Sequence, residues 1–354
     1  QEDEPQRQGD DQAQPGLGAL LVLELAPEHH AVAGWQVDLS ADPLDGNYVL
    51  TRVNSNSTLI HADYTNAALA PAAPNVAAFA PLAGGADGVA PMSAVEYEGN
   101  PALPPDQRTG LAALEIIDEV ALLMAPDEVH PTLNAANQSQ LMNDLVTQCE
   151  RLTDRFAILN VLGGQGLVQN IFPPRDTSYA AIYYPWVRVF DPYTRDTVLV
   201  PPAGHVAGIY ARSDRERGVH KAPANEVVRD IITRDINATR KPLEFTLARG
   251  DQDILNPRGI NVIRDFRADR RGIRVWGART LSGDPLWRYV NVRRLFNYVK
   301  ESVDEGTQWV VFEPNDENTW ARVRQVVSDF LTLVWRSGAL FGATEDQAFF
   351  VRCG

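Results

Sequence analysis

The stretch from Trp287 to Gly338 constrains the fold most, because apolar side chains recur there at helical spacing in two successive segments. The first apolar stripe consists of Val292, Leu295, Phe296, Val299 and Val303. The second consists of Trp320, Val323, Val326, Val327, Phe330, Leu331 and Val334. The spacing predicts two amphipathic helices whose stripes face the core. Gly306 and Gly338 are placed to end them.

The residues between these helices predict a further element. Trp309–Phe312 is an apolar run without alternation, as in a strand that is covered on both faces. Asn315 is the expected cap of the second helix. The opposite face of the first helix is expected to face solvent and carries Arg293, Arg294, Asn297, Lys300, Glu301 and Asp304.

Residues 110–354 alternate between strand and helix patterns. Apolar runs at Glu119–Met124 and Phe156–Val161 flank a helical segment, His130–Leu152, so they predict a β-α-β unit with a parallel strand pair. A short helix is expected at Gly204–Ser213, and Asn225–Ile236 is amphipathic. Further strands are expected at Ser178–Val189, Ile260–Ile263, Gly272–Trp276 and Ala348–Cys353. The predicted fold is a three-layer α/β core with a mixed sheet.

The first 109 residues have a different character. Residues 1–16 are acidic and rich in Gln, Pro and Gly, which predicts a flexible tether. Residues 17–109 contain short strand-like runs, the last at Val95–Tyr97, separated by turn signals. They predict a small β-rich domain.

Charge is distributed unevenly along the chain. The net charge is −14; residues 1–110 hold 15 acidic and 3 basic residues (−12), and residues 111–354 hold 31 and 29 (−2). An acidic surface argues against nucleic-acid binding. No run of 18 apolar residues occurs, so membrane insertion is not expected. Cys149 and Cys353 are expected to be reduced thiols.

The sequence contains only weak motifs for catalysis or for binding a phosphate or a metal ion. Gly163–Gly166 follows a strand, but no Gly-Lys-Ser/Thr occurs, so a plain loop is favoured over a phosphate site. His205 and His220 lack partners at the spacing of metal ligands. Asp176, Ser178 and His205 are the residue types of a catalytic triad, but no Gly-x-Ser-x-Gly motif supports one. We therefore expect no catalytic residues, cofactor or metal. An α/β enzyme or nucleotide-binding protein remains the alternative, and it would need titratable groups that converge at the strand ends.

The segment WRYVNVRRLFNYVKESVDEGTQWVVFEPNDENTWARV resembles the C-terminal core of contractile tail sheath proteins. GLAALEIIDEVALLMAPD, SYAAIYYPWVRV, LNPRGINVIR and GIRVWGARTLS resemble earlier core segments in the same order. The family includes sheaths of contractile phages, R-type bacteriocins and extracellular contractile injection systems, and the sequence does not distinguish them. In this family the region corresponding to residues 17–109 faces outward.

The resemblance implies a structural role rather than catalysis. It implies a subunit that polymerises helically, as stacked hexameric rings, around an inner tube protein, with baseplate and terminal cap proteins as further partners. Contraction of the sheath then drives the tube through a target envelope. The particle would be assembled in the bacterial cytoplasm and found in a phage tail or an extracellular injection particle.

Family subunits carry an N-terminal arm with a Tyr-Pro-Gly-Val-Tyr type segment and a C-terminal arm beyond the Phe-Phe-Val-Arg-Cys strand. Neither arm occurs in this sequence, and we expect a chain that is trimmed at both ends. Such arms add strands to neighbouring subunits. The expected intersubunit strand residues are Phe349, Phe350, Val351 and Arg352.

In the family, a core helix docks on the tube largely through charge. With the second apolar stripe on the sheet, the polar residues of the same helix are free for this contact. The expected tube-contact residues are Arg322, Arg324, Asp329 and Arg336.

Overall fold

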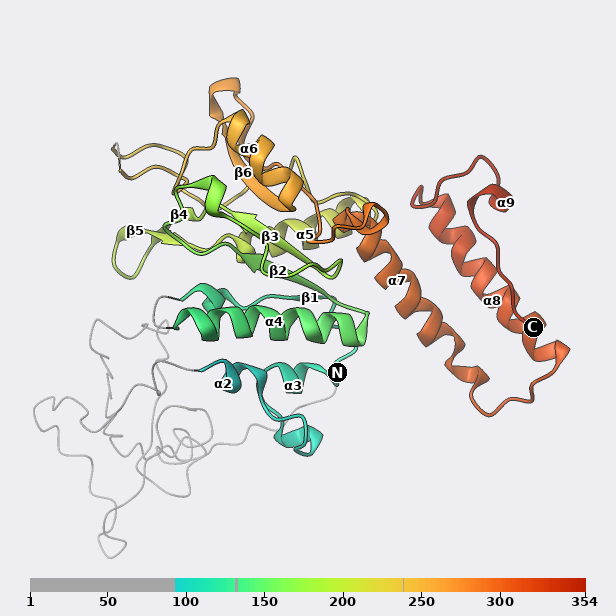
Figure 1. Ribbon diagram of the computed structural model, residues 1–354. Coiled ribbons are helices and arrows are strands. Elements are labelled where there is room, and N and C mark those ends of the chain that lie inside the picture. Colours follow the sequence, from blue (N-terminus) through green and yellow to red (C-terminus); the bar gives the residue numbers. More distant parts are fainter. Residues whose placement is uncertain (1–92, 131–132, 238) are drawn as a thin grey trace, which may run out of the picture. The chain divides into compact units, whose positions relative to one another are not determined.

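A five-stranded mixed sheet lies at the centre of the part of the chain that the computed structural model describes, residues 93–130, 133–237 and 239–354 (Figure 1). The strand order is β1-β2-β3-β6-β7; the first four strands are parallel and β7 is antiparallel to β6. The strands are β1 (Leu122–Leu123), β2 (Phe156–Asn160), β3 (Ala180–Tyr184), β6 (Ile260–Phe266) and β7 (Gly272–Val275). A separate antiparallel hairpin is formed by β4 (Val187–Asp191) and β5 (Asp196–Val200).

Helices cover both faces of this sheet. The α-helices are α2 (Ala94–Glu98), α3 (Gly110–Leu114), α4 (Ala135–Leu152), α5 (Ala203–Arg217), α6 (Arg249–Leu255), α7 (Val290–Thr307), α8 (Glu317–Arg336) and α9 (Glu345–Ala348). Short 3₁₀ turns are η1 (Pro105–Gln107), η2 (Pro126–Val129), η3 (Val168–Asn170), η4 (Asn256–Arg258), η5 (Arg267–Asp269), η6 (Pro285–Trp287) and η7 (Gln308–Val310). The described residues thus have the predicted α/β fold with a mixed sheet.

Successive side chains of the central strands point to opposite faces of the sheet, so each face has its own apolar core. In β2, Ala157 and Leu159 pack with α4 and α6, while Phe156 and Ile158 pack with α5 and the first residue of α7. Every residue of β2 and β3 is buried, as expected for parallel strands covered on both sides. The predicted β-α-β unit is confirmed, because β1 pairs in parallel with β2 across α4.

The two long C-terminal helices form a hairpin without an intervening strand. The predicted strand Trp309–Phe312 is wrong: η7 occupies its start, Phe312 has φ 78°, and Val311 and Phe312 are exposed. Gly306 lies inside α7 rather than at its end. The cap of α8 is Asp316, whose carboxylate accepts from the Thr319 amide at 2.8 Å, so the predicted cap was one residue early.

Three other segments depart from the prediction. Val95–Tyr97 lies in the short helix α2, whose Ala94 packs against Leu141 of α4. Asn225–Ile236 is irregular, apart from a bridge between Val227 and β7. Residues 349–354 form no strand in the described structure, because α9 takes up Ala348 and no described strand lies alongside the segment to pair with it.

The predicted tether (residues 1–16) and the strands predicted in residues 17–66 lie outside the described residues. None of the helices that the structure describes is both long and apolar enough to span a bilayer.

Candidate assembly surface

Helix α7 packs on the core through the face that the sequence assigned to solvent. Arg293, Arg294 and Asn297 are only 7%, 6% and 3% exposed, whereas Phe296 on the apolar stripe is 50% exposed. The predicted orientation of α7 is therefore wrong. Hydrophobic spacing alone identifies a helix, but here the buried side chains are polar and are held by hydrogen bonds to the core.

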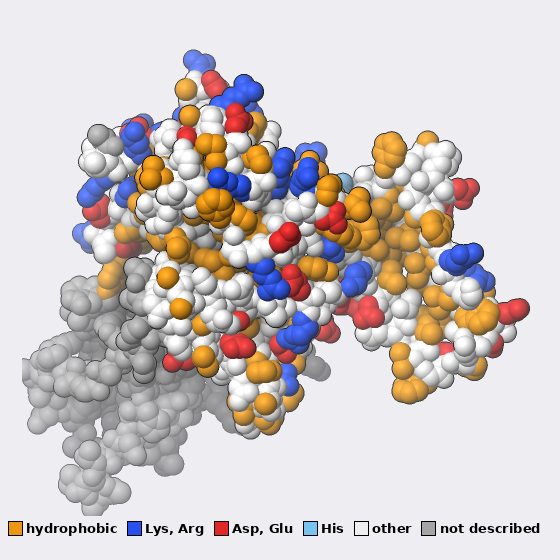
Figure 2. Space-filling view, viewed as in Figure 1, with side chains coloured by type: hydrophobic (Ala, Val, Ile, Leu, Met, Phe, Trp, Pro, Cys, Tyr) orange, Lys and Arg blue, Asp and Glu red, His pale blue; other side chains and the backbone are white. Residues whose placement is uncertain are grey.

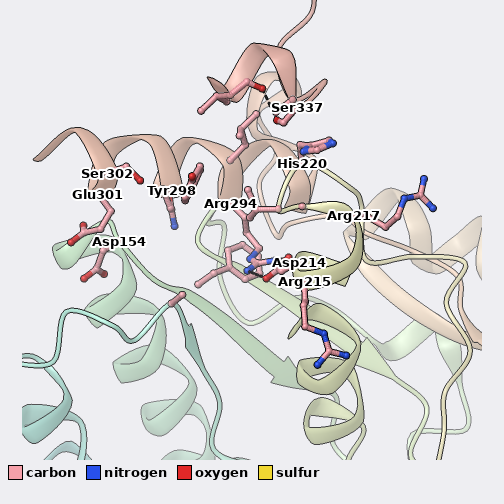
Figure 3. A pocket seen from close by; sticks show the side chains of 18 of the residues that line it. Asp154, Asp214, Arg215, Arg217, His220, Arg294, Tyr298, Glu301, Ser302 and Ser337 are labelled. Carbon is pink, nitrogen blue, oxygen red and sulfur yellow. Dashed lines mark hydrogen bonds and ion pairs between the residues drawn. The ribbon is translucent and has the colours of Figure 1, made fainter. Parts of the chain in front are cut away.

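The buried polar side chains of α7 bond to the core, although Asn297 Oδ1 has no hydrogen-bond partner among the described residues. The Arg293 Nε donates to Ser178 Oγ at 3.0 Å, and its guanidinium lies 3.5 Å from the ring centroid of Trp287. Arg294 makes two parallel hydrogen bonds to the Asp214 carboxylate, at 2.8 and 2.6 Å, from α7 to α5 (Figure 3). Such bidentate pairs offset the cost of removing charge from water.

This arrangement leaves apolar side chains of the hairpin on the surface. Phe296 of α7 and Leu333 of α8 are 50% and 65% exposed, and Phe350, beyond α9, is 88% exposed. Figure 2 shows hydrophobic side chains gathered around α7 and α8. The two helices meet through Tyr298 and Phe330, whose ring centroids are 5.9 Å apart. Contiguous exposed apolar surface of this kind marks an interaction site.

A groove of about 830 Å³ lies where this hairpin meets the edge of the core. Its walls come from the residues before β1 and β2, the end of α5, and α7 and α8 (Figure 3). Phe330, Leu333 and Val334 of α8 line one side. The apolar stripe of α8 therefore borders this groove and α7, and the prediction that it faces the sheet is wrong.

The residues predicted for the tube contact do not form one cluster. Arg322, Asp329 and Arg336 are seven residues apart, so they share one face of α8. Arg322 lies 4.3 Å from the ring centroid of Trp309, and Asp329 accepts from Gln325 Nε2 at 2.7 Å. Arg324 lies on another side of the helix.

The side chain of Arg324 is occupied within the chain, because its Nη1 donates to the Cys353 carbonyl at 2.6 Å. This bond ties the C-terminal segment to α8. Within that segment Phe349 and Val351 are half-buried, while Phe350 and Arg352 are exposed. Such alternation is the pattern of a strand with one covered face.

The motifs considered for chemistry do not assemble into a reactive centre. Among the described residues, no three His, Cys, Asp or Glu side chains are grouped to hold a metal ion. His205 lies on α5, where burial lowers its pKa. His220 follows that helix and lines the groove, while Gly163 faces the Trp186 ring.

One buried polar network was not anticipated from the sequence. Glu128 is fully buried in η2; its Oε1 accepts from the amide and, at 3.0 Å, from Nδ2 of Asn160. Asn160 Oδ1 in turn accepts from the Ala203 amide at the start of α5, at 2.8 Å. Burial raises the pKa of Glu128 to about 8. No sequence signal distinguishes this glutamate from a surface one in a turn.

Family models match most of the described chain. The central domain of phage tail sheath proteins matches residues 100–281, and the C-terminal domain of phage tail sheath proteins matches residues 282–352. A prophage major tail sheath protein of Pseudomonas aeruginosa (strain UCBPP-PA14) is 28% identical over 223 residues, which is 58% of this chain and 51% of the relative.

Solved structures agree with this match. The helical sheath of the anti-feeding prophage in its contracted state superposes with a TM-score of 0.56 at 33% identity, over 67% of this chain and 61% of that one. A chain of the anti-feeding prophage baseplate gives 0.56 at 33% identity, over 69% and 62%. The chain thus spans between half and two thirds of the length of these relatives.

Proposed function

We propose that this chain, which belongs to the phage tail sheath protein family, is a structural subunit of a contractile sheath. The similar solved structures are a helical sheath and a baseplate assembly. The observation that carries the proposal is the match of both sheath models to residues 100–352, together with the exposed apolar surface of the α7–α8 hairpin. A protein that polymerises needs such a surface, whereas a monomer has no use for it.

In this proposal the chain forms a helical homopolymer of stacked hexameric rings around an inner tube protein. Baseplate and terminal cap proteins bind its two ends, and residues 17–109 face outward. Contraction exchanges one set of contacts between subunits for another set of lower free energy. Nucleotide hydrolysis is then unnecessary, and the assembled protein belongs to a tail or an extracellular particle.

The C-terminal segment is the proposed link between subunits. Phe349, Phe350, Val351 and Arg352 would pair with a strand of a neighbouring copy by β-augmentation. The alternating exposure of the segment and its hydrogen-bonded anchor at Arg324 support this role. Proline at Val351 removes one backbone donor, so it should weaken assembly without unfolding the core.

The proposed contact with the tube uses one face of α8. Arg322, Asp329 and Arg336 share that face, and its two arginines suit an acidic tube surface. Arg324 is better assigned to the chain's own C-terminal segment. Reversing Arg322 and Arg336 to Glu should prevent the extended sheath on the tube while leaving contracted sheath without a tube.

The experiment that tests the proposed function is assembly of sheath by the protein expressed together with its particle's tube and baseplate proteins. Phe296→Asp and Leu333→Asp should abolish sheath in electron micrographs while the purified chains remain folded. Arg234→Glu, at an exposed position far along the chain from the hairpin, is the matched control and should assemble. Normal sheath from both hairpin variants would contradict this use of the surface.

A further inference from the structure

A second surface of the same chain is rich in unneutralised positive charge. A pocket of about 500 Å³ lies at the starts of β3 and β6. Its charged lining comprises Arg175, Asp176, Arg258, Arg279 and Arg288. We call the set Arg258, Arg279 and Arg288 the arginine pocket.

The arginines of this pocket lack acidic partners within the described chain. Arg175 is paired with Glu150 at 2.5 Å, but none of the three pocket arginines has an ion pair within 4.0 Å to a described residue. Arg258 Nη1 donates to the Gln169 and Ile171 carbonyls, at 2.9 and 2.7 Å.

The other two pocket arginines are also half-buried. Arg279 Nη1 donates to the Asn256 carbonyl at 3.1 Å, which leaves its charge without a counter-ion. No hydrogen bond or ion pair to a described residue holds the Arg288 side chain. Nearby amides are already taken, since Gly283 donates to Asp176 at 3.2 Å. The donors left for a partner are guanidinium groups, which match carboxylates in geometry and charge.

The same chain also carries an acidic patch of carboxylates that lack basic partners in the described chain. Asp118 precedes β1, while Glu301, Asp304 and Glu305 lie three and four residues apart on one side of α7. None of these four forms an ion pair within 4.0 Å with a described residue. Lys300, on the same helix, forms no ion pair with them, and its Nζ donates to Thr153 Oγ1.

Like charges crowd this patch. Burial and the neighbouring carboxylates, Asp154 first, raise the pKa of Glu301 (Figure 3). Asp154 itself is held by Arg155 at 2.8 Å. The carboxylates that remain, Asp118, Glu301, Asp304 and Glu305, therefore favour a cationic partner from outside the chain.

Helix α7 keeps the two charged surfaces apart. Arg288 precedes its first turn and Glu301 lies 13 residues later, so they are roughly 20 Å apart along the helix axis. The two surfaces cannot neutralise one another within one rigid copy. Two copies related by a head-to-tail operation can bring them together, and such heterologous contacts generate helical polymers.

We infer that the arginine pocket of one copy receives the acidic patch of a neighbouring copy. This rests on the proposed function only in requiring that the chain associates with itself. The contact joins mostly exposed carboxylates to half-buried guanidinium groups, so it sets the register between copies and weakens with salt.

The test is self-association of the purified chain at low salt, measured by sedimentation velocity. Arg279→Glu with Arg288→Glu reverses the pocket and leaves Arg258 in place. Asp304→Arg with Glu305→Arg reverses the exposed part of the patch. Each double variant should weaken association at least about tenfold, the effect of ~1.4 kcal/mol. Arg234→Glu with Arg249→Glu changes the net charge as the pocket variant does, at two exposed positions that belong to neither the pocket lining nor the patch, and should associate like the wild type.

Recombining the variants makes the test specific. The pocket variant and the patch variant, mixed, should associate in alternation, because each pocket then meets a patch of the opposite charge. A chain that carries both reversals should associate again. Wild-type association of the pocket variant overturns the inference, as does a failure of the doubly reversed chain to recover.

Other outcomes separate the possible partners. An unaffected patch variant beside a weakened pocket variant would show that another acidic segment binds the arginines, and would overturn the inference as stated. A wild-type chain that does not associate at low salt would overturn it too. Sheath absent from particles, with this association intact, would refute the proposed function alone.

Discussion

Replacing Glu128 by glutamine tests whether a buried carboxyl controls the stability of the core. Glu128 is fully buried, and one carboxylate oxygen accepts two hydrogen bonds from Asn160. The other oxygen, Oε2, has no hydrogen-bond partner among the described residues. Burial therefore favours the neutral form and raises the pKa from 4.5 to about 8.

The sign and size of the effect follow from proton linkage. Because the folded pKa is raised, the folded chain holds the proton more tightly, so the stabilisation is fully present below pH 4.5. It is lost as the pH rises towards about 8, at about 1.4 kcal/mol per pH unit. The whole window corresponds to an order of 5 kcal/mol in the free energy of unfolding.

Denaturant unfolding from pH 5 to pH 8 provides the assay. Glu128→Gln keeps an acceptor for Asn160 and cannot ionise, so its stability advantage over the wild type should grow as the pH rises. Glu119→Gln, at an exposed position in the same region, is the matched control and should follow the wild type. If the difference between Glu128→Gln and the wild type were the same at pH 5 and pH 8, the argument would be refuted.

Two further predictions concern single side chains, and a third concerns nucleotide binding. Burial raises the pKa of the Cys149 thiol, so a thiol reagent should label half-exposed Cys353 and leave Cys149 unmodified until the chain unfolds. Arg293→Ala removes the stacking on Trp287 and two hydrogen bonds and should lower the free energy of unfolding by about 2–4 kcal/mol, against roughly 0.5 kcal/mol or less for exposed Arg234→Ala. A mechanical subunit should neither bind ATP in isothermal titration nor hydrolyse it, and saturable micromolar binding would count against the proposed function.

The sheet was largely predictable because its strands obey simple rules. β2 is apolar up to its last residue, Asn160, β3 is a continuous apolar run, and a helix between β1 and β2 requires a parallel pair. The pattern overestimated the length of β1, which pairs over only Leu122–Leu123. Pairing length depends on the neighbouring strand, and apolar spacing does not report it.

The candidate surface was predictable only in part. Both helices of the hairpin were identified, but the orientation of α7 was inverted, because Arg293 and Arg294 are buried by partners more than 75 residues away. Such partners leave no periodic signal near the helix. Of the apolar side chains that the pattern assigned to the core of the chain, Phe296 and Val326 are exposed and most others are half-buried. If the proposed function holds, they are core residues of the assembly.

The most direct test of the central claim is electron cryomicroscopy of particles assembled by the protein with its tube and baseplate proteins. The account predicts a helical sheath whose repeating subunit is this chain, with α7 and α8 covered by neighbouring copies. Particles with a sheath built from another protein would contradict it, as would a lattice in which the apolar face of this hairpin remains exposed to solvent.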